Sequence, residues 1–236
     1  MLETTRPASS DDVDSGRTMA STLEALLRRD IIVGELKPNS KLRVKELSER
    51  YDAGTIPLRE ALSRLCAGGF VVAIDQKGFR VSDISVGELE DITRTRQEIE
   101  RLAITRAIHR RDPQWEGEVL AAHHLLGGIP VYDPLQPDRI NVEWERAHDR
   151  FHEILTAGSR SGWLQRFAAM LRDQTARYRH LSVTAPHGHD RDVGSEHDEI
   201  VKAIVSRDVE LASSLLAVHF GRTAELVTET MRQKYI

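Results

Sequence analysis

The chain has 236 residues, a length typical of two modest domains rather than of one large domain. Hydrophobic residues make up 40% of it, charged residues 30% and aromatic residues 5%, a composition that suits helices built from Leu, Ala, Arg and Glu. Cys66 is the only cysteine, which excludes an intramolecular disulfide and a zinc ribbon and favours the reducing cytoplasm. No stretch approaches the ~18 consecutive apolar residues that span a bilayer.

The net charge of −4 is unevenly distributed along the chain. Residues 1–16 are polar and acidic, lack the basic start and apolar stretch of a signal peptide, and are predicted to form a disordered tail. Residues 17–84 carry twelve Lys/Arg against nine Asp/Glu, whereas residues 85–236 carry twenty against twenty-four. The positive excess therefore lies in the N-terminal part, where it could face nucleic acid.

Two short helices are predicted first. Apolar residues recur at helical spacing over Met19–Ile32, and Gly34 then ends the helix. After a turn at 37–40, a second short helix is expected over Val44–Tyr51.

A third helix follows quickly. Pro57 fits the first helical position, with Thr55 or Ile56 as the cap, and the Gly68-Gly69 pair ends the helix. Its predicted apolar stripe consists of Leu58, Ala61, Leu62 and Leu65.

The spacing of apolar residues then changes from that of a helix to that of β-strands. Residues 70–74 and 78–81 read as two strands joined by a turn at 75–78, which is a β-hairpin. Three helices followed by a hairpin is the order of a winged helix-turn-helix, whose third helix enters the DNA major groove. We therefore predict that residues 17–84 form a DNA-binding domain.

Beyond Ser85 the strand signals vanish. Residues 85–236 are predicted to form an all-helical domain for effector binding and dimerisation, so the fold class is mainly α. The expected helices span residues 86–111, 114–127, 138–157, 160–183, 191–206 and 208–233.

The third helix offers the best base-reading residue. Arg59 lies in its first turn, away from the apolar stripe, and an arginine can hydrogen-bond guanine O6 and N7 together. Thr55 is a second DNA-facing candidate on the same turn. Phosphate contacts, which position a protein without reading sequence, are predicted for Arg43, Lys45, Arg64 and Lys77.

The run IVGELKPNSKLRVKELSERYDAGTIPLREALSRLCAGGFVVAIDQKGFRV resembles the winged-helix domain of GntR-type bacterial regulators of the FadR-like subfamily. The family core P-V-R-E-A-L corresponds to Pro57–Leu62 here. The family commonly has Ser-Arg-Thr before this proline, whereas this chain has Gly54-Thr55-Ile56 and lacks one frequent DNA-contacting arginine. Together with QKGFRV, this variant resembles the branch of carbon-starvation-induced, glutarate-responsive regulators.

Four histidines suggest a metal site. His148 and His152 are four residues apart, so both imidazoles share one helix face at a spacing that can chelate one metal ion. His197 and His219 lie on the last two predicted helices, and antiparallel packing could bring both inward.

The C-terminal part also resembles the FCD-type ligand-binding domain of the same regulators, over about residues 86–230. In that family, an Asp or Asn, the His of an F-H pair and two later His bind a metal such as zinc or nickel. Phe151-His152 matches the F-H pair, Glu196-His197 an E-H pair, and His219 the last ligand. His148 stands where the Asp or Asn usually is, which still supplies a ligand but removes a carboxylate.

The resemblance also implies an effector site. Arg96 matches the Arg of an R-x-x-x-E helix with Glu100 as its partner, and Arg177 and Arg179 lie on a helix that the family packs against its cavity. Guanidinium groups beside a metal would hold a carboxylate, so we expect a small organic acid as effector.

These features predict a non-enzymatic, ligand-responsive regulator, most simply a repressor, that binds operator DNA as a homodimer. A metal-dependent hydrolase is an alternative, because His148-Asp149-Arg150-Phe151-His152 resembles the H-E-x-x-H helix of metalloproteases with Asp149 in place of the general base. A protein-interaction module without DNA binding is a further alternative.

Overall fold

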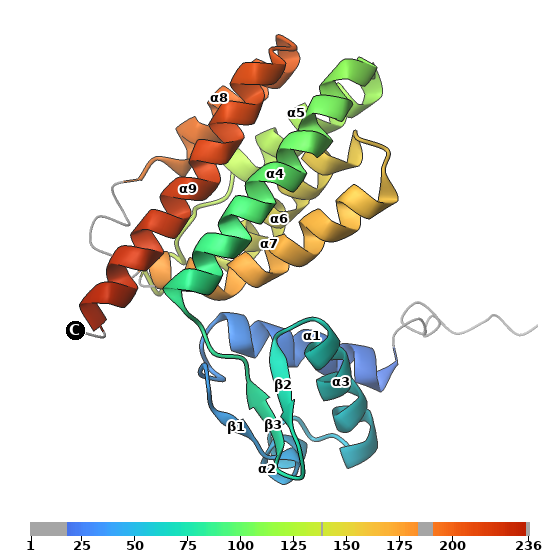
Figure 1. The fold of residues 1–236 in the computed structure, drawn as a ribbon, viewed down its shortest axis with the longest axis vertical. Helices are drawn as coiled ribbons and strands as arrows, with labels where there is room; N and C mark the ends of the chain where they lie inside the picture. Colours follow the sequence, from blue (N-terminus) through green and yellow to red (C-terminus); the bar gives the residue numbers. More distant parts are fainter. Residues whose placement is uncertain (1–17, 138, 184–190, 235–236) are drawn as a thin grey trace, which may run out of the picture. The chain divides into compact units, whose positions relative to one another are not determined.

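The computed structural model describes residues 18–137, 139–183 and 191–234, so the tail predicted over residues 1–16 lies outside the described residues. Two compact units make up the chain (Figure 1). The first lies within residues 1–82, and the second contains residues 83–236 together with the short stretch 32–34. None of the helices in the described ranges is long and apolar enough to cross a membrane.

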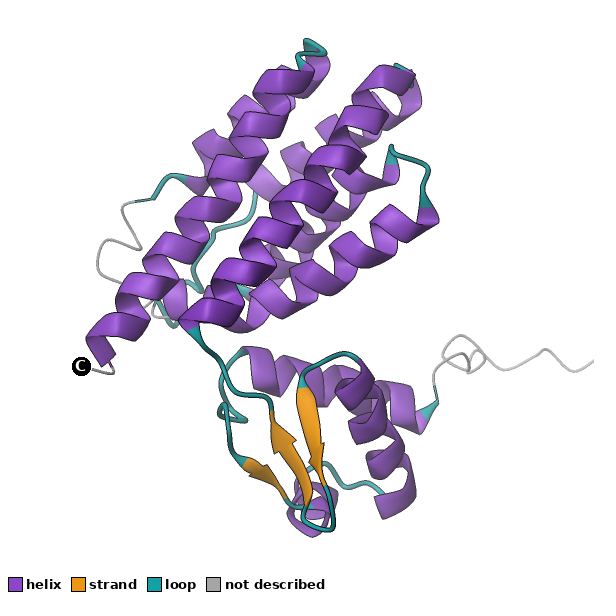
Figure 2. Ribbon diagram, in the orientation of Figure 1, coloured by secondary structure: helices purple, strands orange, loops and turns teal. Residues whose placement is uncertain are grey.

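The N-terminal unit is a winged helix-turn-helix, as predicted, with three helices and a small antiparallel sheet in the order β1-β3-β2 (Figure 2). Its elements are α1 (Met19–Ile32), β1 (Lys41–Leu42), α2 (Val44–Arg50), α3 (Thr55–Ala67), β2 (Val71–Ile74) and β3 (Gly78–Val81). Strand β1 was not predicted, because two residues are too few to show an alternating pattern. It pairs with β3 through Lys41 opposite Arg80 and Leu42 opposite Phe79.

Helix α3 starts earlier than predicted. Its N-cap is Gly54, which provides no side-chain hydrogen bond, so Thr55 and Ile56 are helical residues rather than caps and their prediction as caps is wrong. Pro57 is therefore the third helical residue. This costs no hydrogen bond, because the first N–H groups of a helix have no partner within it. The predicted stripe of Leu58, Ala61, Leu62 and Leu65 is buried.

A buried carboxylate ties α1 to the helix-turn-helix. Asp30 of α1 accepts hydrogen bonds from Arg50 Nη2 at 2.9 Å and from Tyr51 Oη at 2.7 Å. Both partners lie at the end of α2. Charge-assisted bonds of this kind are the strong ones, so they fix the position of α2 against α1.

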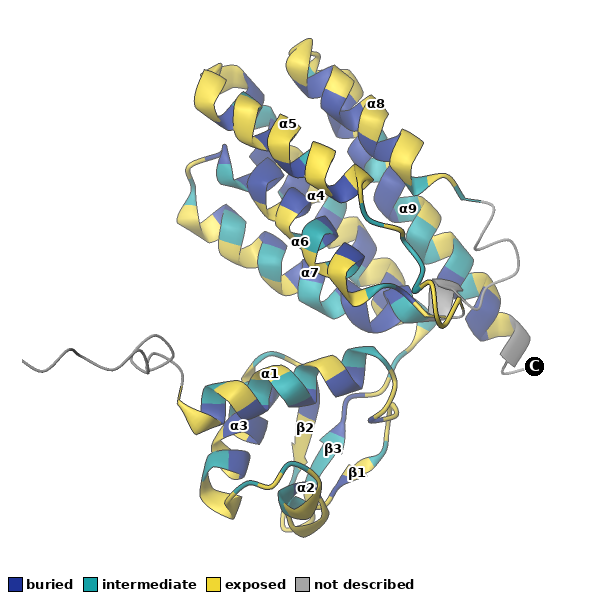
Figure 3. Cartoon of the chain, turned by 180° about the vertical axis from the view of Figure 1, so that it is seen from behind, coloured by how far each residue is buried: buried dark blue, intermediate teal, exposed yellow. Residues whose placement is uncertain are grey.

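The C-terminal unit is the predicted all-helical bundle. It contains α4 (Val86–Arg110), α5 (Pro113–Gly127), α6 (Val142–Ala157), α7 (Gly162–Val183), α8 (Val193–Val205) and α9 (Val209–Lys234). Helix α4 packs against α7 and α9, α5 packs against α6 and α8, and α8 packs against α9. The inner faces of these helices are buried and their outer faces exposed (Figure 3).

Helix α6 begins later than the predicted residue 138. The preceding segment forms an isolated antiparallel bridge between Tyr132 and Ile140. Asn141 then caps the helix by accepting a hydrogen bond from the Glu143 backbone N–H at 2.9 Å. This cap sets the start of the helix that carries His148 and His152.

The end of α6 is held against α5 by a close approach of Gly158 to Trp115. A Cβ added at Gly158 would lie 2.4 Å from Trp115 Cε2. The indole cannot easily withdraw, because its Nε1–H donates to the Ile154 carbonyl at 2.8 Å.

We therefore expect Gly158→Ala to lower the free energy of unfolding of the C-terminal unit by about 1–3 kcal/mol through overpacking. Gly117→Ala is the matched control, because Gly117 is an exposed residue inside α5 with nothing within 4 Å of an added Cβ. Relief of the glycine entropy cost should stabilise this control by about 0.5–1 kcal/mol. Denaturant unfolding of both variants measures the difference, and an equal effect in the two would contradict the clash.

Candidate DNA-binding surface and effector site

One face of α3 is exposed to solvent. Thr55, Ile56 and Arg59 are exposed in its first two turns, opposite the buried stripe. Because Gly54 provides no side-chain cap, the first N–H groups of α3 are available to an anion such as a phosphate. This face combines a guanidinium, a hydroxyl and an apolar side chain.

Three of the predicted phosphate contacts, Arg43, Lys45 and Lys77, are exposed. Arg43 occupies the N-cap position of α2 without a side-chain capping bond and forms an ion pair with Glu46 at 2.6 Å. Lys77 lies in the turn between β2 and β3.

Arg64 is placed differently from the other predicted phosphate contacts. It donates to Glu60 Oε1 at 2.6 Å and to Ser21 Oγ at 2.9 Å, so its side chain joins α3 to α1. The structure therefore gives Arg64 a packing role, which its sequence position did not indicate.

The four predicted ligand histidines converge inside the C-terminal bundle. His148 and His152 come from α6, His197 from α8 and His219 from α9, and each is at most 5% exposed. One ring nitrogen from each lies within 4.8 Å of the others. The Nε2 atoms of His148 and His152 are 3.2 Å apart.

The rings of this cluster are held in the neutral form. Burial lowers the pKa of His148, His152 and His197 well below the usual value, and for His148 and His152 nearby arginines such as Arg96 add to the effect. Burial also lowers the pKa of His219, to about 4, although its hydrogen bond to Glu196 opposes the shift. Neutral imidazoles are the form that binds metal ions.

Two glutamate carboxylates lie close to ring nitrogens of the histidine cluster. His219 Nδ1 is 2.7 Å from Glu196 Oε2. Burial by itself would raise the pKa of Glu196, but hydrogen bonds from Arg191 and His219 lower it far below the usual value. The carboxylate is thus ionised and can only accept, so His219 donates from Nδ1 and keeps a lone pair on Nε2.

Glu100 stands behind His152 at a longer distance, 3.9 Å between Glu100 Oε2 and His152 Nδ1. Both atoms are buried and, within the described residues, have no hydrogen-bond partner. The same holds for His197 Nε2. Buried polar atoms are normally satisfied, so this cluster has unused capacity to bind a ligand.

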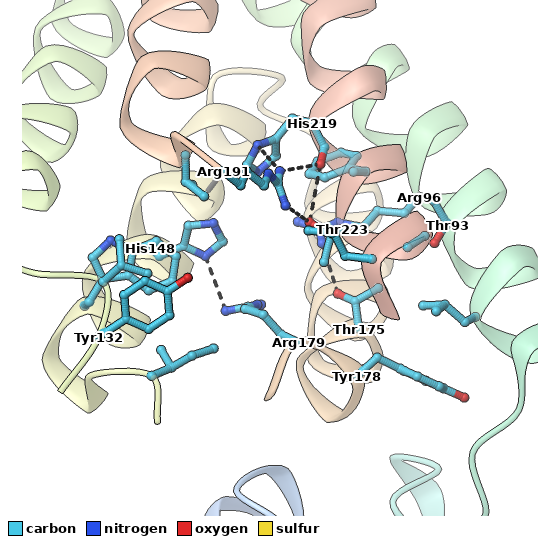
Figure 4. Close-up of a pocket in the computed structure, with 18 residues that line it drawn as sticks. Thr93, Arg96, Tyr132, His148, Thr175, Tyr178, Arg179, Arg191, His219 and Thr223 are labelled. Atoms are coloured by element: carbon cyan, nitrogen blue, oxygen red, sulfur yellow. Dashed lines mark hydrogen bonds between the residues drawn. The ribbon is translucent and has the colours of Figure 1, made fainter. Parts of the chain in front are cut away.

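A cavity of about 70 Å³ adjoins the cluster (Figure 4). His148 and His219 reach its wall, together with the guanidinium groups of Arg96, Arg179 and Arg191. The rest of the lining is mainly apolar and includes Leu89, Val131, Ile140, Trp144, Val193, Phe220, Ala224 and Leu226.

The arginines of the cavity are held by neighbouring side chains. Arg96 donates from Nε to Glu100 at 2.6 Å and from Nη1 to Thr175 at 3.0 Å, while its Nη2 is buried without a hydrogen-bond partner in the described part of the chain. Arg179 Nη1 lies 3.3 Å from both His148 Nδ1 and Asp149 Oδ1.

Arg191 was not singled out as a site residue by the sequence analysis, which placed it at the start of a helix predicted over residues 191–206, whereas α8 begins at Val193. Its two bonds to Glu196, at 2.6 and 2.9 Å, place it on the cavity wall.

Arg177, a predicted effector-binding residue, does not line the cavity. It donates to the Asp83 carbonyl and to Gln174 Oε1, and it lies 3.7 Å from Glu88. Its contacts thus secure the start of α4.

The hydrolase alternative finds no support in this geometry. Asp149, which would have to act as the general base, is engaged by Arg179 at 3.3 Å.

Comparison with known proteins agrees with both units. The family model described as "Bacterial regulatory proteins, gntR family" matches residues 19–81, and the FCD domain model matches residues 91–222. The chain is 35% identical over 212 residues to the HTH-type transcriptional repressor GlaR of Escherichia coli (strain K12), covering 87% of this chain and 94% of GlaR. It is 33% identical to the HTH-type transcriptional regulator BphR of Paraburkholderia xenovorans (strain LB400), covering 86% and 82% of the two chains.

Among solved structures, that of E. coli McbR/YncC has the same fold, with a TM-score of 0.73 at 21% identity over 93% of this chain and 100% of that one. The matches span the winged helix and the bundle together, and the relatives are named as regulators rather than enzymes. The chain therefore belongs to the gntR family of bacterial regulatory proteins and is a DNA-binding transcriptional regulator with an FCD domain.

Proposed function

We propose that this regulator is a homodimeric repressor whose operator binding is controlled by a small organic acid, held beside a metal ion in the FCD domain. The observation that carries the proposal is the cluster of four buried, neutral histidines that opens onto a cavity lined by three arginines. The name of the relative GlaR, a transcriptional repressor, supports the direction of control.

The donor set fits a metal ion. In a tetrahedral site with metal–nitrogen bonds of about 2.0–2.1 Å, ligand atoms are about 3.3 Å apart. The Nε2 atoms of His148 and His152 already have this spacing, at 3.2 Å. Imidazole ligands suit zinc and nickel among the available metals. Such an ion would supply positive charge at the edge of the cavity, and an acid would bind to it directly only if its coordination expanded beyond the four histidines.

The cavity fits a small anion. Its volume of about 70 Å³ holds about five water-sized positions, which corresponds to a compact acid. Arg96, Arg179 and Arg191 place positive charge on its wall, and Arg96 Nη2, which has no hydrogen-bond partner among the described residues, could donate to a carboxylate. Apolar side chains on the remaining wall would cover the carbon skeleton of the acid.

Arg179 couples the acid to the histidines. An arginine can only donate, so its contact at 3.3 Å makes His148 Nδ1 an acceptor and places the proton of the neutral ring on Nε2. A carboxylate that drew Arg179 away would let this proton move to Nδ1 and free the Nε2 lone pair. Acid and metal would then bind cooperatively.

The DNA-binding unit is connected to this site through α4. Arg96 lies on α4, and only residues 82–85 separate the end of β3 from the start of that helix. An acid that binds two arrangements of α4 with different affinity would shift their populations and thus the freedom of the winged helix. A twofold dimer would place two α3 helices on a pseudo-palindromic operator.

The base-reading role predicts that Arg59→Ala lowers the preference for operator over random DNA by about 1–3 kcal/mol per half-site. Lys45→Ala is the control, because loss of a phosphate contact should weaken binding to all sequences alike and reduce the salt slope by about one. Titration by fluorescence anisotropy at several salt concentrations measures both effects. An unchanged operator preference in Arg59→Ala would exclude the role.

The metal proposal predicts that His152→Ala and His197→Ala lose the bound ion, with affinity reduced at least about 100-fold, because each removes a ligand outright. His124→Ala is the control, since His124 is an exposed residue of α5. Elemental analysis after loading with zinc or nickel and dialysis gives the metal content. Full occupancy in both ligand variants would show that the assignment is wrong.

The effector proposal predicts that Arg179→Met weakens the binding of small mono- and dicarboxylates at least about tenfold, because it removes a buried cationic donor while nearly keeping its volume. Arg166→Met is the control on the same helix, where the side chain is exposed. Thermal shift with the zinc-loaded protein finds the acid, and calorimetry then compares the variants. Equal affinity in both variants would remove Arg179 from the effector site.

A further inference from the structure

Ile56 is an exposed isoleucine on the DNA-facing side of α3. Its side chain is 80% exposed, although it lies in the first turn of a helix whose other face is fully packed. Isoleucine gains nothing for helix stability at such a place, since β-branching lowers helix propensity and water surrounds the side chain. Its apolar surface therefore contributes nothing to the folding of the unit.

The neighbours of Ile56 indicate what covers it. Arg59 lies three residues later, so the two side chains project from the same face of the helix, and Thr55 is exposed beside them. The uncapped N-terminus of α3 and the exposed cations Arg43 and Lys45 are suited to the phosphates that flank a groove. Charge complementarity thus favours duplex DNA over another protein as the occupant of this face.

Within the major groove, the apolar group offered by a base edge is the C5-methyl of thymine. We infer that Ile56 contacts this methyl group and makes the operator require a thymine at one position in each half-site. The inference rests on the proposed insertion of α3 into the major groove, and it adds a specificity-determining residue to it.

The spacing of the two side chains fixes where the thymine lies. Three residues of helix advance about 4.5 Å along the axis. Successive base pairs are about 3.4 Å apart. The thymine should therefore be adjacent to the guanine read by Arg59, or one base pair beyond it.

The test starts from a random duplex library, from which the full-length wild-type protein selects its operator. Each thymine of that operator is then replaced by deoxyuridine, which removes the methyl group alone. Ile56→Ser removes the apolar contact and Ile56→Val largely keeps it. Because residue 56 is exposed, thermal unfolding of both variants should match the wild type.

At one thymine near the guanine read by Arg59, we expect replacement by deoxyuridine to lower the affinity of wild type and Ile56→Val about fourfold per half-site. This factor corresponds to the burial of one methyl group. Ile56→Ser should bind the thymine and uracil operators equally there, with an unchanged salt slope. Leu125→Ser, which alters a 68% exposed apolar residue of α5, should keep the wild-type discrimination.

If wild type and Ile56→Ser discriminated equally between the thymine and uracil operators, or if neither discriminated, the inference would be overturned. The selected operator would in that case still demonstrate specific DNA binding. A selection that enriches no sequence at all would overturn base reading by α3, and this inference with it.

Discussion

The burial of four imidazole rings at one point is the constraint on which the C-terminal unit depends. Burying polar groups is costly unless they are neutral and hydrogen-bonded. Here three helices bring the rings together, and the carboxylates of Glu100 and Glu196 stand behind two of them. His197 Nε2 is buried and has no hydrogen-bond partner in the described ranges, so the cluster has a ring nitrogen with capacity for a further ligand.

Charge balance connects this cluster to the cavity. Arg96, Arg179 and Arg191 are countered by Glu100, Glu145 and Glu196, so the unit is close to neutral around the neutral rings. A divalent ion would add two positive charges, and its four histidine ligands would contribute no carboxylate. His148 occupies the position where FCD domains usually have Asp or Asn. An organic anion would therefore be held more strongly here than in a site with a carboxylate ligand.

The sequence predicted those parts of the structure that follow from the spacing of apolar residues and from residues that end a helix or form a turn. Helix α1 was predicted with its observed ends, because an apolar stripe and a following glycine define it. Strand β1 and Arg191 escaped prediction because their roles depend on partners distant in sequence: β1 pairs with β3, and Arg191 donates to Thr223 and to the His219 carbonyl. Arg177 and Arg179 could not share the cavity for a simple reason: two residues are about 200° apart around a helix.

The pairing of cations with nearby glutamates in the N-terminal unit constrains how this regulator can bind DNA. Of the four cations predicted to contact phosphates, Arg43 and Arg64 are paired with Glu46 and Glu60, whereas Lys45 and Lys77 are exposed. Lys37 and Lys41 are further exposed cations of this unit. Each phosphate contact adds only about −0.9 to the salt slope, so a few contacts on one chain give weak binding that carries no sequence preference. The proposed twofold dimer would double the contacts and square the base discrimination, so direct reading by α3 on two half-sites would supply the specificity that charge does not.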